Sequence, residues 1–351
     1  MNSNAKPHPE EIRQAIADNP KKRERDLAES LGISEAQLLA AQLGQAVKAI
    51  NPHPDHVMPC AETFGEVMAL TRNPSCVHEK VGRYENYHPG NHAAMVLTED
   101  IDLRIFPSNW CHGFMVEKEL SEGDVRRSLQ VFDAAGDAVH KIFLREGSDL
   151  SAWEKAKTTM AVSDVPQDLE VAPRKPAEAP KADVSKVDTL RKEWGRMTDT
   201  HQFMRLTSKL KMNRLGAYRI AGEPMARPLP PSAVNTMLEK LQESATEVML
   251  FVGNRGCIQI HTGALRSLRP MGPWQNVMDP RFNLHLRLDH VAEVWAVDKP
   301  TQRGAAMSVE AFDEEGALIF QVFGVPKEGR DSRPAWRALV GELETQEQEN
   351  V

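Results

Sequence analysis

An internal repeat with one fixed offset constrains the fold of this chain more than any other feature of its sequence. The segment Ser128–Gly136 (SLQVFDAAG) returns as Ser308–Gly316 (SVEAFDEEG), an offset of 180 residues. Upstream, Glu66–Leu70 (EVMAL) resembles Glu247–Phe251 (EVMLF) at an offset of 181. An offset that holds over most of half the chain predicts two homologous lobes in tandem.

Within each lobe, helical patterns come first and short strand patterns follow. In the first half, helices are expected over residues 10–17 and 25–39, and a proline-rich loop over 51–59. The clearest strands are expected over residues 93–97, 101–106, 113–117, 128–133 and 139–144, with a helix over 149–161. The short turns between these strands favour antiparallel hairpins over βαβ crossovers. The sequence therefore predicts an α+β protein.

A linker separates the two lobes. Residues 163–187 are rich in Pro, Ala, Lys, Glu and Asp and contain few large apolar side chains, which is typical of a linker. We therefore divide the 351 residues into an N-terminal repeat (1–160), a linker (161–188) and a C-terminal repeat (189–345). Because duplicated proteins commonly bind their ligand between the copies, we expect a cleft between the lobes.

The bulk properties favour a cytoplasmic protein. The net charge of −7 provides no global positive field to recruit nucleic acid. No apolar run approaches 18 residues, so no membrane insertion is expected, and the N-terminus lacks the pattern of a signal peptide. The cysteines are scattered without a C-x-x-C pair, which predicts reduced thiols. They are Cys60, Cys76, Cys111 and Cys257.

Residues 25–39 offer an alternative function, because they resemble a helix-turn-helix. Gly32 permits the turn and Ser34 can cap the second helix. That second helix is rich in Glu, Gln and Ala, whereas a helix that reads bases is backed by phosphate-binding cations. Two packed helices are therefore the favoured explanation of the pattern. Similarly, Gly253–Gly256 resembles a backbone clamp for nucleic acid but is more typical of a hairpin turn.

Other chemistries lack a signature. The chain contains no nucleotide-binding glycine motif and no G-x-S-x-G. His53 and His56, and Cys76 with His78, do not have the paired spacing of a structural zinc site.

His201 is the most informative single residue of the second half. A helix is expected to begin after Thr198 or Asp199, either of which can act as its N-cap. Its predicted buried stripe consists of Phe203, Leu206 and Leu210. At helical spacing His201 lies roughly opposite this stripe, so its side chain is expected to point away from the core. A surface histidine explains this by itself, but the first helix after the linker is also well placed to reach a cleft.

Haem binding accounts for several of these features. Haem needs an axial donor such as imidazole, an apolar slot, and Arg or Lys for its propionates. Oxygen chemistry at its iron also needs a hydrogen-bond donor on the distal side. Strand alternation places Asp102, Arg104 and Phe106 on one face, so Arg104 is a candidate for this donor. A solvated or salt-bridged sheet face remains an alternative for the same pattern.

Several longer motifs make the chain similar to a known family. They are Gly82–Tyr87 (GRYENY), Gly90–Ala93 (GNHA), Ile101–Pro107 (IDLRIFP), Asp199–Phe203 (DTHQF), Val294–Thr301 (VWAVDKPT) and the repeated Phe-Asp-x-x-Gly. With these motifs the sequence resembles the HemS/ChuS/PhuS family of bacterial cytoplasmic haem-trafficking and haem-degrading proteins. The resemblance covers roughly residues 20 to 345.

The resemblance implies a specific architecture and site. It implies two tandem structural repeats, each with a large antiparallel β-sheet and flanking helices, and a haem cleft between the lobes. It implies that His201 is the proximal iron ligand and that Arg104 lies on the distal side. The residues that it implies as pocket lining are Arg214, Phe251, Lys299 and Gln321. The chain has Gln202 where several relatives have a second histidine, and Phe323 where some have a tyrosine.

The function that follows is haem handling in iron acquisition. We expect imported haem b to bind through His201 and to be degraded oxidatively, with an external electron donor, so that iron is released. The alternative is a non-catalytic chaperone that receives haem from an ABC importer and delivers it to a separate haem oxygenase. The sequence does not decide whether the protein is an enzyme. A DNA-binding regulator that uses the N-terminal helical pair is a distant alternative.

Overall fold

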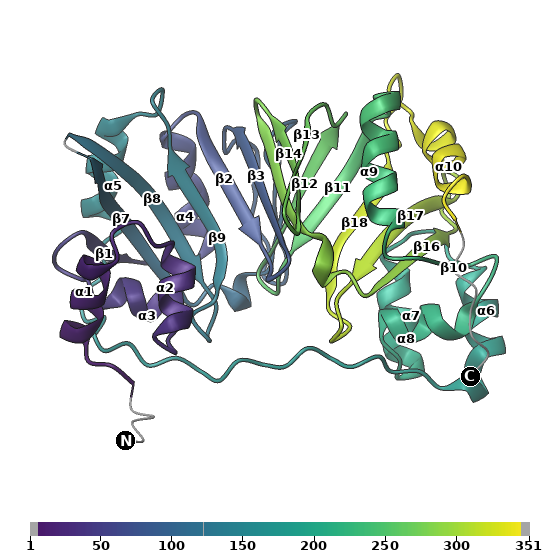
Figure 1. Cartoon of the computed structure of the whole chain (residues 1–351), viewed down its shortest axis with the longest axis horizontal. Coiled ribbons are helices and arrows are strands. Elements are labelled where there is room, and N and C mark those ends of the chain that lie inside the picture. Colours follow the sequence, from purple (N-terminus) through teal and green to yellow (C-terminus); the bar gives the residue numbers. More distant parts are fainter. Residues whose placement is uncertain (1–5, 122, 345–351) are drawn as a thin grey trace. The chain divides into compact units, whose positions relative to one another are not determined.

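The chain folds into two compact units, and neither unit is one continuous half of the sequence. A computed structural model describes residues 6–121 and 123–344 (Figure 1). Unit 1 comprises the chain up to Arg72, Glu79–Lys175 and Gly253–Gln259. Unit 2 comprises Asn73–His78, Pro176–Val252 and the chain from Ile260 onward. The main division falls within the segment expected to be a linker, and each unit contains a short segment from the other half of the sequence.

Unit 1 contains a five-stranded antiparallel ladder in the order β1-β7-β8-β9-β2, and a smaller ladder β6-β5-β4. Its helices are α1 (Pro9–Asp18), α2 (Glu24–Ser30), α3 (Glu35–Ala40), α4 (Pro54–Thr63) and α5 (Leu150–Thr159), with the short 3₁₀ helix η1 (Pro107–Asn109). Its strands are β1 (Val47–Ile50), β2 (Val67–Arg72), β4 (Tyr87–His88), β5 (Ala94–Leu97), β6 (Asp102–Ile105), β7 (His112–Ser121), β8 (Asp124–Phe132) and β9 (Ala138–Leu144).

Unit 2 repeats this plan with the ladder β10-β16-β17-β18-β11 and the smaller ladder β15-β14-β13. Its helices are α6 (Val187–Trp194), α7 (Gln202–Leu210), α8 (Arg214–Ala221), α9 (Ala233–Ser244) and α10 (Arg333–Gly341), with the 3₁₀ helices η2 (Val184–Lys186) and η3 (Leu288–His290). Its strands are β10 (Ala226–Leu229), β11 (Val248–Gly253), β13 (Leu268–Met271), β14 (Trp274–Asp279), β15 (Phe282–Arg287), β16 (Glu293–Lys299), β17 (Ala306–Phe312) and β18 (Leu318–Gly324). Two further strands, β3 (Cys76–Gly82) and β12 (Cys257–Gly263), each carry residues of both units.

The strand register confirms the 180-residue repeat in detail. Ser128 of β8 pairs with Phe143 of β9, and Ser308 of β17 pairs with Phe323 of β18. The register also shifts at the corresponding place in both ladders, next to Phe132 in β8 and next to Phe312 in β17. Such β-bulges bend a strand locally, so the duplication has preserved the shape of the sheet as well as the strand order.

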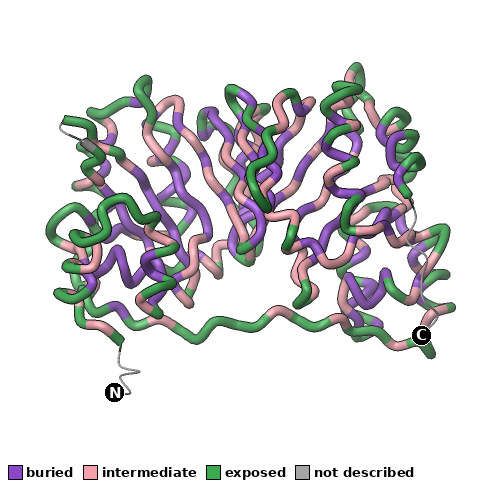
Figure 2. Tube along the Cα trace, viewed as in Figure 1, coloured by how far each residue is buried: buried purple, intermediate pink, exposed green. Residues whose placement is uncertain are grey.

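Helices cover both faces of the unit 2 ladder, and its core is correspondingly divided in two. Side chains of α9 and α10 form one hydrophobic cluster with alternate residues of β11, β17 and β18. Side chains of α6, α7 and α8 form another with residues of β16 and β17. Figure 2 shows that the buried residues concentrate in the strands and on the helices packed against them.

The N-terminal helical pair forms as predicted, but its second helix is buried. Gly32 has a φ of +67°, which a turn between two helices requires. The hydroxyl of Ser34 accepts a hydrogen bond from the backbone N–H of Gln37 at 3.2 Å, which caps α3. All six residues of α3 are buried. A helix that reads DNA must present its side chains to the major groove, and α3 presents none.

One sequence expectation for unit 1 is wrong. Residues 51–59 were expected to form a loop, but α4 begins at Pro54. Proline is well tolerated at the first position of a helix because its missing N–H has no partner there. Pro59 lies inside α4 and removes one hydrogen bond; burial of Val57, Met58 and Ala61 offsets this cost.

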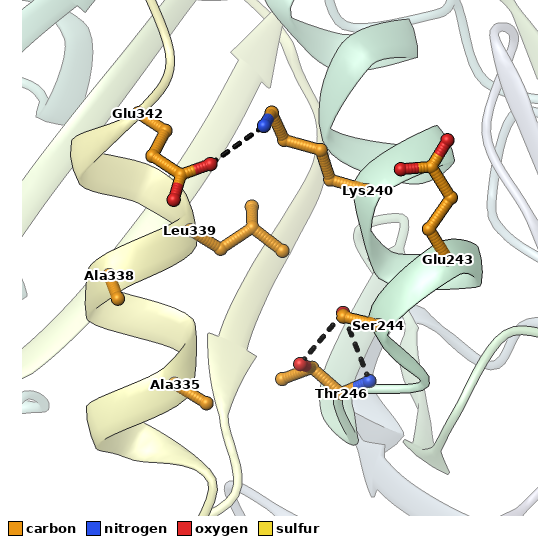
Figure 3. Close-up of a pocket in the computed structure, with 8 residues that line it drawn as sticks. All are labelled: Lys240, Glu243, Ser244, Thr246, Ala335, Ala338, Leu339 and Glu342. Atoms are coloured by element: carbon orange, nitrogen blue, oxygen red, sulfur yellow. Dashed lines mark hydrogen bonds and ion pairs between the residues drawn. The ribbon is translucent and has the colours of Figure 1, made fainter.

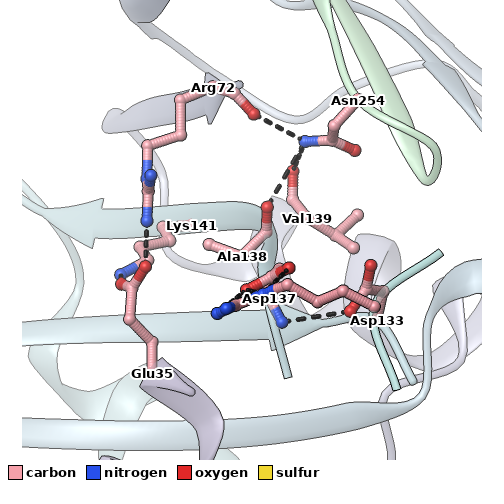
Figure 4. A network of polar contacts seen from close by, with 9 residues as sticks. Glu35, Arg72, Asp133, Asp137, Ala138, Val139, Lys141 and Asn254 are labelled. Atoms are coloured by element: carbon pink, nitrogen blue, oxygen red, sulfur yellow. Dashed lines mark hydrogen bonds and ion pairs between the residues drawn. The ribbon is translucent and has the colours of Figure 1, made fainter. Parts of the chain in front are cut away.

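A buried ion network joins α3 to the ladder of unit 1 (Figure 4). The carboxylate of Glu35 forms ion pairs with Arg72 of β2 and with Lys141 of β9, the latter at 2.7 Å. Burial raises the pKa of Glu35, but Lys141 and Arg72 outweigh burial and lower it to about 2. In the same view, the amide of Asn254 donates to the carbonyl of Arg72 at 2.9 Å, so the turn Gly253–Gly256 is held on unit 1.

The sequence also predicted no membrane span and reduced cysteines. No described helix combines the length and apolarity needed to cross a membrane. The four cysteines are free of disulfides. Residues 1–5, which bear on the expectation of no signal peptide, lie outside the described part of the chain.

A second buried polar chain in unit 1 centres on His140. Nδ1 of His140 lies 2.8 Å from the hydroxyl of Thr71, and the phenol of Tyr84 contacts Nε2. The hydroxyl of Thr71 is also directed to the thiol of Cys257. Burial lowers the pKa of His140 to about 3, so this ring is neutral at ordinary pH.

We expect unit 1 to lose stability in mild acid because of His140. The unfolded chain binds a proton at the ordinary histidine pKa of 6.5, whereas the folded protein binds it only near pH 3. Stability from this group is therefore full above pH 6.5 and falls as the pH is lowered, by about 2 kcal/mol at about pH 5. Urea unfolding followed by pulsed hydrogen exchange of β8 and β9 measures this fall. In His140→Gln the pH dependence should be flatter, and an unchanged slope would contradict the assignment.

Candidate functional site

A row of side chains crosses the unit 2 ladder on the face that carries α6, α7 and α8. Phe251 pairs with Gln321, Gln321 with Glu310, and Glu310 with Trp295. Because directly paired residues share a sheet face, these four side chains lie on one side. Trp295 belongs to the core beneath the helices, whereas Phe251 and Gln321 are half-buried. Two of the predicted lining residues, Phe251 and Gln321, are therefore direct neighbours.

The buried carboxylate of Glu310 connects the two predicted cations. Arg214 of α8 lies 2.8 Å from one carboxylate oxygen, and Lys299 of β16 lies 2.7 Å from the other. The Tyr218 hydroxyl donates to Glu310 at 2.9 Å, and the Ser308 hydroxyl donates at 2.8 Å. Burial raises the pKa of Glu310, but Lys299 and Arg214 outweigh burial and hold that pKa well below its usual range. Glu310 is therefore a permanent anion.

The two cations differ in exposure, and this separates their roles. The Lys299 ammonium also donates to the Tyr218 hydroxyl at 2.9 Å and lies 5.1 Å from the ring centroid of Phe203. Only 3% of its side chain is exposed, compared with 23% for Arg214. Lys299 therefore supports the site from the interior, and Arg214 is the cation that reaches the surface. One guanidinium N–H of Arg214 is also directed to the sulfur of Met204, at 3.5 Å.

His201 stands at the start of α7 and projects into solvent. The stripe predicted for this helix is buried, with Phe203 1%, Leu206 8% and Leu210 7% exposed. The His201 side chain is 90% exposed. The N-cap itself is His201, and not Thr198 or Asp199 as expected. Asp199 instead accepts the backbone N–H of His201 at 2.7 Å, which fixes the turn directly before the helix.

Local hydrogen bonds fix the segment that carries His201. The ring Nδ1 of His201 lies 2.7 Å from the same oxygen of Asp199. The Gln202 side chain accepts the backbone N–H of Thr198 at 2.9 Å and donates to its hydroxyl at 3.1 Å. The carbonyl of Thr198 in turn accepts the backbone N–H of Gln302 at 3.0 Å. Hydrogen bonds from His201 hold the pKa of Asp199 below its usual range, chiefly the bond from the backbone N–H.

Arg104 belongs to unit 1, whereas the other predicted site residues belong to unit 2. The alternation predicted for β6 is observed: Leu103 and Ile105 are buried, while Asp102 and Arg104 are half-buried on the other face. Arg104 forms an ion pair with Asp102 and donates to the carbonyl of Leu103 at 3.1 Å. The guanidinium is thus partly exposed and already paired.

Comparison with known protein families identifies the family of this chain. The Haemin-degrading HemS.ChuX domain matches residues 32–160 and 211–343. The chain belongs to the HemS/ChuX family. Arg104 and the four lining residues lie within the matched segments, whereas His201 lies between them.

Full-length relatives of this HemS/ChuX-family chain share both sequence and fold. The Hemin transport protein HmuS of Yersinia pestis is 39% identical over 333 residues, which cover 94% of this chain and 95% of HmuS. The crystal structure of holo-PhuS, a heme-binding protein from Pseudomonas aeruginosa, has a TM-score of 0.91 and 38% identity, covering 97% of this chain and all of PhuS. ChuS, an E. coli heme oxygenase, has a TM-score of 0.82 and 31% identity, covering 92% of this chain and 96% of ChuS.

Glu310 and Asp199 are site residues that sequence reasoning missed. The repeat offered a signal for the first, because Glu310 replaces Gln130 of the otherwise similar segment in unit 1. A carboxylate at the centre of a buried strand requires cations around it. Asp199 was considered only as a cap, and its contact with the imidazole depends on the turn at residues 199–201.

Outside this row, the described residues include a groove but no cluster of side chains that could hold a metal ion. Among the described residues, no group of three His, Cys, Asp or Glu side chains could hold a metal ion. Figure 3 shows a groove between α9 and α10 that contains the small side chains of Ala335 and Ala338. The ion pair between Lys240 and Glu342, 2.7 Å long, crosses it.

We expect Glu310→Ala to destabilise unit 2 strongly. The substitution leaves Lys299 buried without its counter-ion, and removal of one partner from a buried ion pair costs about 3–5 kcal/mol. Urea unfolding measures the loss. The matched control is Glu342→Ala, which removes an exposed ion pair of the same unit and should cost less than about 1 kcal/mol. Similar losses in the two variants would contradict the central role of Glu310.

Proposed function

We propose that this protein binds imported haem through His201 and degrades it oxidatively, so that iron is released in the cytoplasm. The observation that carries the proposal is the exposed imidazole of His201, whose Nδ1 faces Asp199 and whose Nε2 faces away from that bond. Neutral imidazole is a common axial ligand of haem iron. The names of HmuS, PhuS and ChuS, which concern hemin transport, heme binding and heme oxygenase activity, support the same conclusion.

The surroundings of the unit 2 row suit the remainder of the haem molecule. Phe251 and Phe323 are half-buried, and their ring centroids lie 5.3 Å apart. These rings and the exposed side chain of Met204 offer apolar surface to a porphyrin. Arg214 offers a partly exposed guanidinium, which suits a propionate, and Gln321 offers an amide. Lys299 acts through Glu310 to hold Arg214 in place.

Arg104 is proposed to act on the haem face opposite His201. Bound haem supplies the redox chemistry of its iron, and an external donor supplies the electrons. A guanidinium remains protonated near neutral pH, so Arg104 cannot act as an acid. Its contribution is a fixed positive charge and N–H donors that hold a water molecule and stabilise developing negative charge. The ion pair with Asp102 orients the guanidinium for this task.

A carrier without catalysis is the second candidate, and one observation favours it. The charge of Arg104 is already matched by Asp102, which weakens the field available for oxygen chemistry. The relatives from Yersinia pestis and Yersinia enterocolitica, at 39% and 38% identity, are both named as hemin transport proteins. A carrier of this kind would receive haem from an ABC importer and pass it intact to a separate haem oxygenase.

His201→Ala should abolish well-defined haem coordination, because it removes the iron ligand. A visible spectrum of the haem complex and a haem titration measure this directly. The control is His56→Ala, which removes another exposed histidine and should leave the spectrum and the affinity unchanged. An unaltered spectrum and affinity in His201→Ala would contradict the proposed ligand.

The product of turnover distinguishes the enzyme from the carrier. The haem complex is incubated with a physiological reductase and catalase, and the pigment is then extracted and identified. For an enzyme we expect a cleaved tetrapyrrole, and we expect Arg104→Ala to slow its formation by at least about tenfold with little change in haem affinity. Recovery of intact haem from the wild type would instead establish the carrier. Equal turnover in Arg104→Ala would remove Arg104 from the mechanism.

A further inference from the structure

We propose that Asp199 is the positioning residue that makes His201 an iron ligand; this inference rests on the proposed function. One oxygen of Asp199 receives two hydrogen bonds from His201, from its backbone N–H and from its ring Nδ1, each 2.7 Å long. The two bonds fix both the backbone and the imidazole of the same residue. Asp199 thus acts on the haem through His201 and does not itself contact the iron.

The chemistry of the partner assigns the tautomer of the ring. A carboxylate only accepts hydrogen bonds, so Nδ1 of His201 carries the proton and donates it to Asp199. In a neutral imidazole the lone pair then lies on Nε2, which is the atom needed to bind a metal. A carboxylate behind a ligating histidine also makes the imidazole a stronger donor.

Asp199 provides the only described hydrogen-bond partner of the His201 side chain. The ring is 90% exposed and the Asp199 side chain is 58% exposed. Surface pairs of this kind contribute little to the free energy of folding. The bond therefore fixes the orientation of the ring before haem binds. Without the bond, the ring would lose its rotamer freedom only when haem binds.

The neighbouring residue supports the same arrangement. Gln202 uses both atoms of its amide on Thr198, so it closes the turn on the other side of Asp199. The turn from residue 198 to residue 202 is thereby held by its own side chains. Gln202 therefore has a supporting role in this chain. It stands at the position where several relatives have a second histidine.

The test compares haem complexes of the full chain carrying Asp199→Asn with the wild type. The asparagine keeps an acceptor for the backbone N–H but removes the charge behind the imidazole. We expect a lower iron–imidazole stretching frequency in the resonance Raman spectrum of ferrous haem and a more positive haem reduction potential. We also expect about tenfold weaker haem binding, with an unchanged midpoint of urea unfolding. Asp199→Ser, which keeps a side-chain oxygen without the charge, should reproduce the shifts in stretching frequency and reduction potential.

Asp183→Asn is the matched control. Asp183 accepts the backbone N–H of Ser185 at 3.1 Å in the same type of turn, but among the described residues its partners are Ser185 and Lys186 and not a histidine. This variant should leave the stretching frequency, the potential and the affinity at wild-type values.

The outcomes separate this inference from the function on which it rests. An unchanged stretching frequency and potential in Asp199→Asn, together with lost coordination in His201→Ala, would overturn the role of Asp199 and leave haem ligation by His201 intact. A wild-type spectrum in His201→Ala would overturn both. Shifts of equal size in Asp183→Asn would also overturn the proposal, because they would show a general effect of surface charge.

Discussion

The charge of Glu310 is the constraint on which the candidate site of unit 2 depends. A carboxylate with no exposed surface is tolerated only when cations and hydrogen-bond donors surround it, and here Arg214, Lys299, Tyr218 and Ser308 do so. These partners come from α8, β16 and β17, so the ion cluster fastens the helices to the sheet. Tyr218 also stacks on Phe203 of α7, with ring centroids 5.4 Å apart. The same cluster thereby positions α7, the helix whose N-cap is His201.

The two repeats use the same structural plan with opposite charges. Ser34 caps α3 and Asn213 caps α8, 179 residues later. The next residue is Glu35 in unit 1 and Arg214 in unit 2, and each forms an ion pair with the ladder beneath it. In unit 1 the anion is enclosed by two cations, whereas in unit 2 the cation is partly exposed. The residue 180 positions before His201 is Lys21, so the predicted ligand has no histidine counterpart in the first repeat. At this position the first repeat thus carries an enclosed anion and the second a partly exposed cation.

Local patterns predicted much of this architecture, and long-range contacts account for what they missed. The repeat, the antiparallel strands, the turn at Gly32 and the exposure of His201 all depend on periodicity or on single residues with restricted geometry. The helix α4 was missed because Pro54 and Pro59 favour a loop until the burial of their neighbours is known. The assignment of residues 73–78 and 253–259 to the opposite units has no local signal at all. The ion pair of Lys299 with Glu310 likewise depends on the pairing of β16 with β17, which no local pattern reveals.

The buried ion cluster and the proposed haem ligand lie in different parts of unit 2. The charges of Glu310 and Lys299 are buried and paired with each other. His201, in contrast, lies at a helix end outside the core, and one exposed hydrogen bond to Asp199 orients its ring. A buried ligand would hold haem more rigidly, but its release would require the core to open. Under the proposed function, an exposed ligand at a helix end would allow haem to enter and leave without unfolding, which both a carrier and a degrading enzyme require. Under the proposed function, the distinction between a carrier and an enzyme would lie with groups other than the iron ligand, and Arg104 with its partner Asp102 is the pair that we propose for it.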